Sequence, residues 1–261
     1  MIVNDTRETV LITGASSGIG RELAELFASD GSDLVLVARR KNLLDQLADK
    51  LSSRYGVRAV VMPTDLGAAG AVQEMAHRLS SMSLRIDVLV NSAGFGARGS
   101  FTTLPSERLM EMVEVNIAAV THLTRLFLPS MVQRKRGGVI NLGSVAGFLP
   151  GPNMATYYAS KAYILAFSEA LQEEVRGTGV TVCCVAPGPT DTEFVQQAGL
   201  EGVRFFRLGA MDATTVARSG YRGFRSGRAL VVPGVSNKAA TFLLRFSPRL
   251  LTRRLSGWLN V

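Results

Sequence analysis

Short apolar runs alternate along the chain with longer stretches in which apolar residues recur every three or four positions. The runs are typical of buried strands, and the longer stretches are typical of amphipathic helices. Each gap between runs is long enough for a helical crossover, so the pattern predicts an α/β fold with a doubly wound, Rossmann-type, seven-stranded parallel sheet and helices on both faces. The predicted strands cover about 9–13, 33–38, 58–62, 86–90, 138–142, 180–186 and 228–232.

Length and composition agree with a single α/β domain. The 261 residues are 47% hydrophobic, which is enough for a sizeable core, and no low-complexity linker or internal repeat divides them. We therefore expect one Rossmann-type catalytic domain over residues 1–235 and a helical extension over residues 236–261. In the extension, apolar residues recur at roughly helical spacing, and Ser247-Pro248 predicts that one helix ends there and another begins.

A glycine-rich segment, Thr13-Gly14-Ala15-Ser16-Ser17-Gly18-Ile19-Gly20, follows the first predicted strand and precedes a helical pattern. Gly14 permits a tight turn, Gly18 lets the backbone approach a ligand, and Gly20 lets the helix pack close to the strand. The order is Gly-x-x-x-Gly-x-Gly and not the Gly-x-Gly-x-x-Gly of other dinucleotide folds. The segment predicts a diphosphate site at the N-terminus of the helix.

The second predicted strand ends in Arg39-Arg40, at the place where a carboxylate is expected when the ligand has a free ribose 2′-hydroxyl. Guanidinium groups can instead pair with a 2′-phosphate through two charge-assisted hydrogen bonds. In isolation, a basic pair after a strand is more often a solvated turn. Between a glycine loop and the next helix, the pair favours NADP(H) over NAD(H).

Tyr157 and Lys161 are four positions apart and therefore share one face of a predicted helix. An ammonium group close to a phenol stabilises the phenolate, so we expect Lys161 to lower the pKa of Tyr157 and make it an acid–base group. Tyr158 is the weaker candidate, because the residue four positions on is Ala162. Chance spacing on an ordinary helix is the alternative explanation.

Together these segments resemble the classical short-chain dehydrogenase/reductase family, over about Thr9 to about Thr192. Further matches occur in order and spacing: Asp65-Leu66 after the third strand, Asn91-Ser92-Ala93-Gly94 after the fourth, Asn116 in a helix, Ser144 after the fifth strand, and Pro187-Gly188-Pro189-Thr190 after the sixth.

The resemblance implies a catalytic tetrad of Asn116, Ser144, Tyr157 and Lys161. Ser144 would hold the substrate oxygen and Tyr157 would transfer the proton. Lys161 would lower the tyrosine pKa and bind the nicotinamide ribose, and Asn116 would hold a water that links Lys161 to solvent. A hydride would pass between nicotinamide and the substrate carbon, with the protein supplying placement and electrostatics.

The resemblance also implies a set of cofactor-binding residues. Asp65 would meet the adenine amino group, Asn91 the adenosine side and Thr190 the nicotinamide carboxamide. Ser92 departs from the commoner second Asn of this segment, which leaves one hydrogen bond between strands in doubt. The full set is Gly14, Ser16, Ser17, Gly18, Ile19, Gly20, Arg39, Arg40, Asp65, Leu66, Asn91, Ala93, Gly94, Tyr157, Lys161, Pro187, Gly188 and Thr190.

Some of these residues have a purely structural alternative. Asp65 could cap the following helix, Asn116 could pair with backbone inside its own helix, and Ser144 could simply terminate a strand. Each alternative is reasonable when a residue is considered singly. The joint pattern favours the catalytic interpretation.

Cysteine and histidine usage predicts no metal site. The two cysteines, Cys183 and Cys184, are adjacent in a predicted buried strand, where they face opposite sides and serve as core packing in a reducing compartment. His77 and His122 lie on separate helical stretches without other ligands around them. The first eight residues lack a basic stretch leading into an apolar one, so we expect a cytoplasmic protein.

The net charge of +8 is concentrated at the end of the chain. Nine arginines and lysines and no acidic residue follow Asp212. A basic amphipathic end is typical of proteins that rest on an anionic bilayer, although such helices more often pack on their own domain or on a partner subunit. No apolar run reaches the ~18 residues of a spanning helix. The basic end lacks a recognisable nucleic-acid motif, so we expect no nucleic-acid partner.

The expected pocket residues are mostly apolar, which favours a hydrophobic ketone, aldehyde, 3-oxoacyl chain or sterol-like substrate. The leading hypothesis is an NADP(H)-dependent carbonyl reductase. By resemblance it would be a homodimer or homotetramer formed through the helices that carry Asn116 and Tyr157. A non-catalytic nucleotide sensor or membrane scaffold on the same fold is the alternative. The pocket residues named are Phe148, Met154, Phe194, Val195, Phe205 and Phe206.

Overall fold

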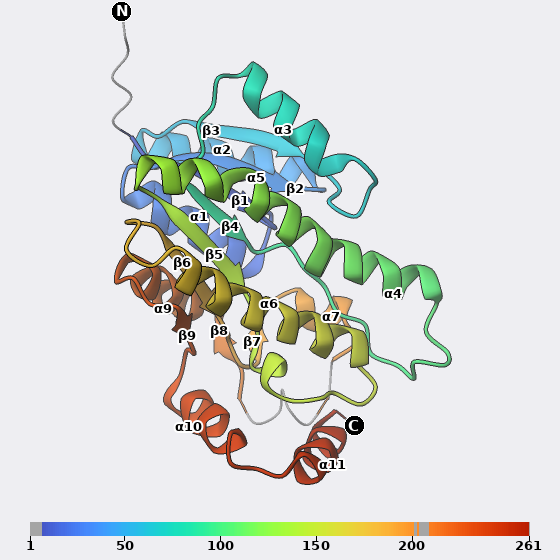
Figure 1. Ribbon diagram of the computed structural model, residues 1–261. Coiled ribbons are helices and arrows are strands. Elements are labelled where there is room, and N and C mark those ends of the chain that lie inside the picture. Colours follow the sequence, from blue (N-terminus) through green and yellow to red (C-terminus); the bar gives the residue numbers. More distant parts are fainter. Residues whose placement is uncertain (1–6, 201–202, 204–208, 261) are drawn as a thin grey trace, which may run out of the picture.

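A seven-stranded parallel sheet forms the centre of the molecule (Figure 1). The computed structural model describes residues 7–200, 203 and 209–260. The strand order is β3-β2-β1-β4-β5-β6-β9, and every neighbouring pair is parallel, so the predicted fold class is confirmed. The strands are β1 (Thr9–Thr13), β2 (Asp33–Ala38), β3 (Ala59–Pro63), β4 (Val88–Asn91), β5 (Gly138–Leu142), β6 (Thr181–Val185) and β9 (Leu230–Val231).

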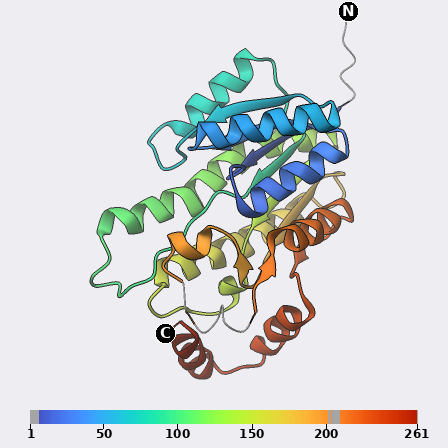
Figure 2. The same cartoon turned by 180° about the vertical axis from the view of Figure 1, so that it is seen from behind.

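Helices cover both faces of the sheet. One face carries α1 (Gly18–Ser29), α2 (Lys41–Tyr55) and α9 (Ala213–Arg225), which lie in front in Figure 2. The other face carries α3 (Ala71–Ser81), α5 (Ala119–Arg134) and α6 (Ala155–Glu174), which lie in front in Figure 1. Successive residues of a strand point to opposite faces, so Val10 and Ile12 enter one core cluster and Leu11 enters the other. Burial on both faces explains the unbroken apolar runs of the strands.

One long helix passes along the second face. It consists of α4 (Ser106–Val113), a π-helical segment η1 (Glu114–Ala118) and α5, which follow one another without a break. By length and composition alone, this 29-residue helix, which contains an 18-residue window with a mean hydropathy of 1.2, is the one helix in the described residues that could cross a membrane. Leu123 and Met131 of α5 pack into the core against the sheet, which accounts for its apolar side chains.

Three short elements follow strand ends: η2 (Val145–Phe148), β7 (Thr190–Asp191) and α7 (Phe194–Gln197). β7 pairs in parallel with β8 (Met211–Asp212), a small sheet that the sequence pattern did not predict. The last two helices, α10 (Val235–Leu244) and α11 (Arg249–Leu259), lie below the layered body in Figure 1. We refer to α10 and α11 as the C-terminal helix pair.

Candidate active site

A cavity of about 340 Å³ lies at the C-terminal edge of the sheet, next to the point where the chain order reverses between β1 and β4. Parallel strands deliver their C-terminal loops to this edge, so residues that are distant in sequence meet there. Gly20, Asn91 and Asn116 do not line the cavity. The predicted site residues that do line it are Gly14, Ser16, Ser17, Gly18, Ile19, Arg39, Arg40, Asp65, Leu66, Ala93, Gly94, Ser144, Tyr157, Lys161, Pro187, Gly188 and Thr190.

The glycine loop packs tightly against the end of β4. Gly14 has a φ of +68°, and a Cβ there would lie 2.8 Å from the backbone nitrogen of Ala93. A Cβ at Gly20 would lie 2.4 Å from the Gly14 carbonyl oxygen, so α1 can begin this close to the loop only with glycine at that position. Thr13 Oγ1 accepts hydrogen bonds from the backbone N–H groups of Ser92 (3.0 Å) and Ala93 (3.1 Å). These contacts fix the glycine loop so that the N-terminus of α1 lines the cavity.

Arg40 lies at one end of the cavity and joins three groups. Its guanidinium donates to Ser16 Oγ (3.1 Å) and Ser17 Oγ (3.0 Å), and it pairs with Glu193 Oε2 at 2.8 Å. The Arg40 hydrogen bond, together with that from Ser17, holds the pKa of Glu193 below its usual value. Arg39 is more exposed and pairs with Glu111 at 3.4 Å. Both arginines therefore already face a carboxylate, and neither Glu193 nor Glu111 was expected from the sequence.

Asp65, at the same end, accepts a hydrogen bond from the backbone N–H of Gly67 at 3.0 Å through Oδ1. This local turn fixes its carboxylate at the cavity wall. The turn lies before α3, so Asp65 is not the cap of that helix, whose N-cap is Gly70.

Ser144, Tyr157 and Lys161 meet at the other end of the cavity. Tyr157 and Lys161 share one face of α6, as the spacing predicted, and the Lys161 Nζ lies 5.8 Å from the centre of the Tyr157 ring. Ser144 is the N-cap of η2, where its Oγ accepts from the backbone N–H of Ala146 at 3.1 Å. Ser144 also hydrogen-bonds the Tyr157 hydroxyl. Lys161 Nζ donates to the Leu142 carbonyl oxygen at 2.7 Å.

The pKa of Tyr157 is not lowered in this site, contrary to the prediction that Lys161 would lower it. Burial raises the pKa of Tyr157 above its ordinary value, and the hydrogen bond from Ser144 opposes this only in part. Burial also lowers the pKa of Lys161 to about 8. The reason is that Lys161 is buried and Tyr157 is partly buried in the wall, where desolvation disfavours the charged form of each. The Tyr157 phenol is therefore held in its protonated form at neutral pH.

Asn116 is buried behind the cavity, in the π-helical segment η1. Its Oδ1 accepts from the Phe95 backbone N–H (3.1 Å), and its Nδ2 donates to the Phe95 carbonyl (2.9 Å) and to Ser160 Oγ (3.1 Å). A Cβ at Gly94 would touch both Asn116 Oδ1 (3.1 Å) and Lys161 Nζ (3.7 Å). Asn116 therefore ties the loop after β4 to α6 beside Lys161, and single-turn π segments are frequent at functional sites.

The Asn91 side chain does not line the cavity and is hydrogen-bonded inside the protein, so the contact with the adenosine side of a cofactor stays a prediction. Its Nδ2 donates to Asn141 Oδ1 (2.8 Å) and Thr124 Oγ1 (3.3 Å). Asn141 in turn donates to Ser168 Oγ at 2.9 Å. The side chain therefore links β4 to β5 and α5.

The wall beyond Tyr157 is apolar. Met154, Phe194, Leu200 and Val203 line it and pack together with Tyr158. Of the predicted pocket residues, Met154 and Phe194 line the cavity, whereas Phe148 and Val195 do not. Phe205 and Phe206 lie outside the described residues.

Asn260, just after α11, also reaches this wall, which the sequence did not indicate. It is buried, and its Oδ1 accepts from the Tyr158 hydroxyl at 2.9 Å. Its Nδ2 donates to the Pro152 carbonyl (3.1 Å), and its own carbonyl accepts from Arg98 Nε (3.0 Å). These contacts fix Asn260 to the apolar side of the cavity.

Cys183 and Cys184 are both free and buried in β6, on opposite faces of the sheet. Burial raises the pKa of each thiol to about 12, so they pack as inert side chains. In the described part of the chain, no three His, Cys, Asp or Glu side chains come together as a metal site.

Comparison with solved structures identifies proteins with bound nicotinamide cofactors. A short-chain dehydrogenase from Sphingobium yanoikuyae in complex with NADPH is 34% identical, covers 94% of each chain and has a TM-score of 0.83. A short chain dehydrogenase/reductase from Burkholderia phymatum in complex with NAD is 27% identical, covers 95% of each chain and has a TM-score of 0.81. Structural neighbours of this chain thus bind either form of the cofactor.

Sequence comparison agrees with the structural comparison. A very-long-chain 3-oxoacyl-CoA reductase of Laccaria bicolor is 38% identical over 174 residues, which is 66% of this chain and about half (52%) of that relative's length. Residues 8–201 match the family model described as short chain dehydrogenase. With this match, the sheet order and the residues around the cavity, the chain belongs to the short-chain dehydrogenase/reductase family of oxidoreductases.

Proposed function

We propose that this protein is an NADP(H)-dependent oxidoreductase that transfers a hydride between nicotinamide and a hydrophobic ketone or aldehyde, or the corresponding secondary alcohol. One observation carries the proposal. A single cavity runs from the Arg40 cluster, past the glycine loop, to Tyr157 and on to an apolar wall. A dinucleotide and an apolar substrate could thus meet at the phenol.

The residues present fit such a cofactor. Glycine at positions 14 and 20 allows a close-packed loop before the N-terminus of α1, which suits a diphosphate. Ser16, Ser17 and Arg40 form a group of donors suited to a 2′-phosphate, with Arg39 nearby. Asp65 and Leu66 would hold the adenine, and Pro187, Gly188, Thr190 and Lys161 the nicotinamide end.

The nicotinamide, when bound, would supply or accept the hydride, and the protein groups manage the proton. The Tyr157 phenol is protonated at neutral pH and would donate this proton to a carbonyl oxygen in the reductive direction. The Ser144 hydroxyl lies beside the Tyr157 hydroxyl, and its contact with the Pro187 carbonyl is long at 3.5 Å, so a substrate oxygen at the phenol would be within reach of both hydroxyls. With a pKa of about 8, Lys161 is largely cationic at neutral pH and would stabilise the phenolate that remains after proton transfer.

The substrate end supports an apolar molecule. Apart from Lys161, none of the described residues that line the wall beyond Tyr157 carries a charge, so the cavity offers no handle for a carboxylate or phosphate near the reacting carbonyl. Ketones on 3-oxoacyl chains and sterol-like rings fall within this class. The similarity to a very-long-chain 3-oxoacyl-CoA reductase supports the former.

The proposal extends to assembly and location. We place the catalytic domain in residues 1–235, in a cytoplasmic homodimer or homotetramer formed through the helices that carry Asn116 and Tyr157. The exposed side chains of Met110 on α4 and Leu126 on α5 support a contact along that long helix.

The test is to titrate the purified protein with NADPH and NADH side by side by calorimetry. Oxidation of the reduced nicotinamide is then followed by absorbance with hydrophobic ketones, aldehydes and 3-oxoacyl thioesters. Tighter binding of NADPH with turnover of an apolar carbonyl is the expected result. Binding without turnover of any compound would favour the nucleotide-sensing alternative, and failure to bind either cofactor would overturn the proposal.

A further inference from the structure

The C-terminal helix pair presents its apolar side chains outward. In the described residues, eight of the twelve exposed large hydrophobic side chains lie between Val235 and Trp258, including Phe246 at 73% and Leu243 at 63% exposure. The side chains that the pair buries are polar: Thr241, Thr252 and Ser256. An ordinary surface helix has the opposite orientation, with apolar residues inward. This concentration of exposed apolar side chains marks an interaction surface.

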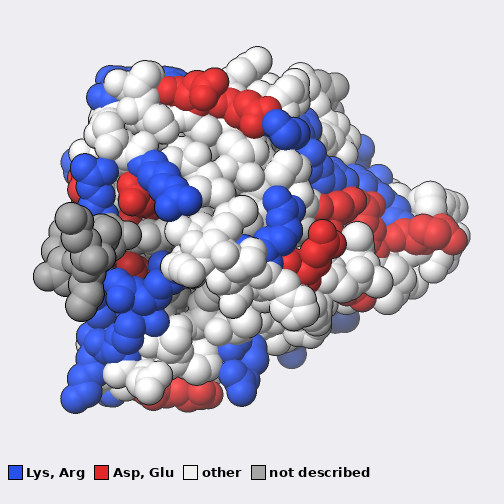
Figure 3. Space-filling view, turned by 90° about the horizontal axis from the view of Figure 1, so that it is seen from above, with Lys and Arg blue, Asp and Glu red and all other residues white. Residues whose placement is uncertain are grey.

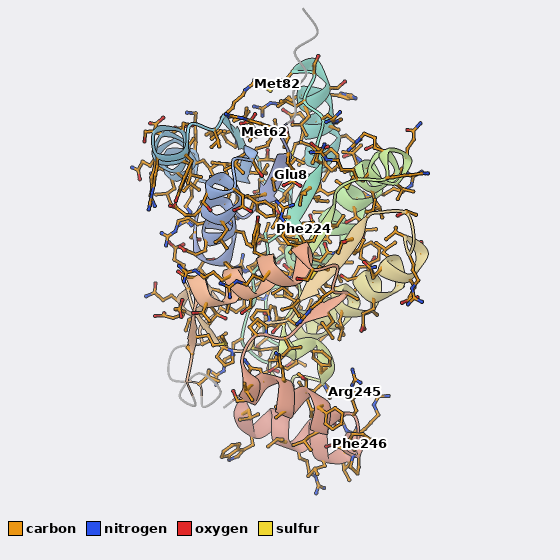
Figure 4. All side chains as sticks on the ribbon, turned by 90° about the vertical axis from the view of Figure 1, so that its left-hand side faces the viewer. Glu8, Met62, Met82, Phe224, Arg245 and Phe246 are labelled. Atoms are coloured by element: carbon orange, nitrogen blue, oxygen red, sulfur yellow. The ribbon has the colours of Figure 1, made fainter. Side chains whose placement is uncertain are left out.

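The ionisable groups on the same helix pair are all cationic. Lys238, Arg245, Arg249, Arg253 and Arg254 lie among the apolar residues and are all exposed. Figure 4 labels Arg245 and Phe246, which lie at the far end of the molecule, in the connection between the two helices. Figure 3 views the opposite end, where acidic and basic side chains alternate. The helix pair thus differs from that end, because its apolar side chains lie among cations with no acidic residue between them.

Charge decides which partner fits this surface. A two-fold dimer would place the patch against its own copy, so five cations of one subunit would face the same five of the other with no acidic group on either helix pair. Like charges brought together across an interface disfavour that pairing. An anionic bilayer accepts both components, because apolar side chains enter the acyl boundary while arginines remain at the headgroups.

The buried side of the helix pair leads to the cavity. Asn260, immediately after α11, lines the apolar wall and accepts a hydrogen bond from the Tyr158 hydroxyl at 2.9 Å. Gly257, within α11, lies against Pro152, to which a Cβ at that position would approach within 3.5 Å. The outward face of α11 and the substrate end of the cavity therefore belong to one structural unit.

We propose that the C-terminal helix pair docks on an anionic lipid bilayer and places the substrate end of the cavity at the membrane surface. The substrate is then a lipid-borne carbonyl compound that enters from the bilayer. This second part rests on the proposed reductase function, whereas the docking itself does not.

Docking is tested by cosedimentation of the full chain, without substrate or cofactor, with vesicles of phosphatidylglycerol and phosphatidylcholine or of phosphatidylcholine alone. The protein should bind the anionic vesicles and lose this binding in high salt. Joint replacement of Arg249, Arg253 and Arg254 by Gln should weaken partitioning by roughly a hundredfold, at about fivefold for each arginine. Joint replacement of Phe242, Phe246 and Leu251 by Ser should abolish it.

Phe101→Ser is the matched control, because Phe101 is 65% exposed but lies outside the helix pair. It should bind vesicles as the native chain does, and an unchanged circular dichroism spectrum and Tm would show that each variant is folded. Docking is overturned if the native chain stays in the supernatant, or if the apolar variant sediments equally. Docking is also overturned if analytical ultracentrifugation shows a dimer for the native chain and a monomer for the apolar variant, which would assign the face to a second copy.

The substrate part needs a separate readout. The apolar variant should retain turnover of a short soluble ketone and lose at least tenfold in rate on a long-chain ketone presented in vesicles. Equal rates of variant and native protein on the vesicle-borne ketone would overturn entry from the bilayer. If neither protein turns over any ketone, the proposed function fails. The vesicle-binding experiment still tests docking independently.

Discussion

The Glu193 carboxylate pairs with the guanidinium group of Arg40, where we propose that the 2′-phosphate of NADPH binds, so the two anions would compete for Arg40. The pair with Arg40 is 2.8 Å long, and Ser17 also hydrogen-bonds the carboxylate. These are the donors that we propose for the 2′-phosphate of NADPH. Glu193→Gln keeps the size of the side chain and removes its charge, so it should release Arg40 and strengthen NADPH binding.

The structure sets the scale of this effect. Arg40 and Glu193 are 41% and 45% exposed, so their ion pair is screened by solvent and contributes about 0.2–1 kcal/mol. Loss of the competing pair, together with the repulsion between a carboxylate and a phosphate, gives a gain of about 1 kcal/mol, or roughly fivefold in Kd. NADH has no 2′-phosphate and should gain less than about twofold.

The assay is calorimetric titration of native protein and variant with both cofactors at low and high salt. Glu173→Gln serves as a control, because Glu173 pairs with Arg176 on an exposed surface outside the cavity. Addition of Arg40→Gln should cancel the gain, as expected for coupled residues. Equal tightening for NADH and NADPH, or none for NADPH, would refute the assignment of Arg40 and its hydroxyl partners to the phosphate.

Three further predictions concern the same site. Tyr157→Phe should lower turnover by about 10²- to 10⁴-fold with unchanged cofactor affinity, and normal turnover would remove Tyr157 from the chemistry. Arg39→Asp should weaken NADPH by about tenfold relative to NADH, and an unchanged preference would show that the phosphate is read elsewhere. Since burial lowers the pKa of Lys161 from 10.5 to about 8, the unfolded chain binds this proton more tightly than the native state does. The free energy of unfolding, measured in urea, should therefore rise from about pH 8 to 10.5 relative to Lys161→Met, by up to roughly 3 kcal/mol, and parallel pH curves for the two proteins would contradict this.

The strands were predictable where burial is continuous. β1 and β2 coincide with the predicted runs at 9–13 and 33–38, because residues such as Val10 to Ile12 have both faces covered. β9 contains only Leu230 and Val231, shorter than the predicted 228–232. Its length is set by the two residues of β6 that pair with it, and this pairing is invisible in a local pattern. The β7–β8 pair is likewise a contact between distant segments without an apolar signature.

The candidate site, like the strands, was predictable only in part. Its location followed from topology, because parallel strands carry the glycine loop and Ser144 to one edge whatever the details of packing. Glu193 and Asn260 were missed, because their partners, Arg40 and Tyr158, lie far away in sequence. The pKa of Tyr157 was predicted in the wrong direction, since spacing on a helix reveals a neighbouring charge but not the depth of burial.

The orientation of an amphipathic helix is also hidden from periodicity, although here the sequence holds a usable signal. Thr252 and Ser256 of α11 and Asn260, its C-cap, recur every four residues and are buried, so polar groups of this helix end face the body. The larger apolar side chains, Leu251 and Leu255 among them, are then left outside. Exposure of such side chains to water costs about 25 cal/mol for each Å² of apolar surface, a cost that a docked bilayer removes. A polar stripe of period four beside a cationic face without acidic residues is therefore the sequence pattern on which the docking proposal depends.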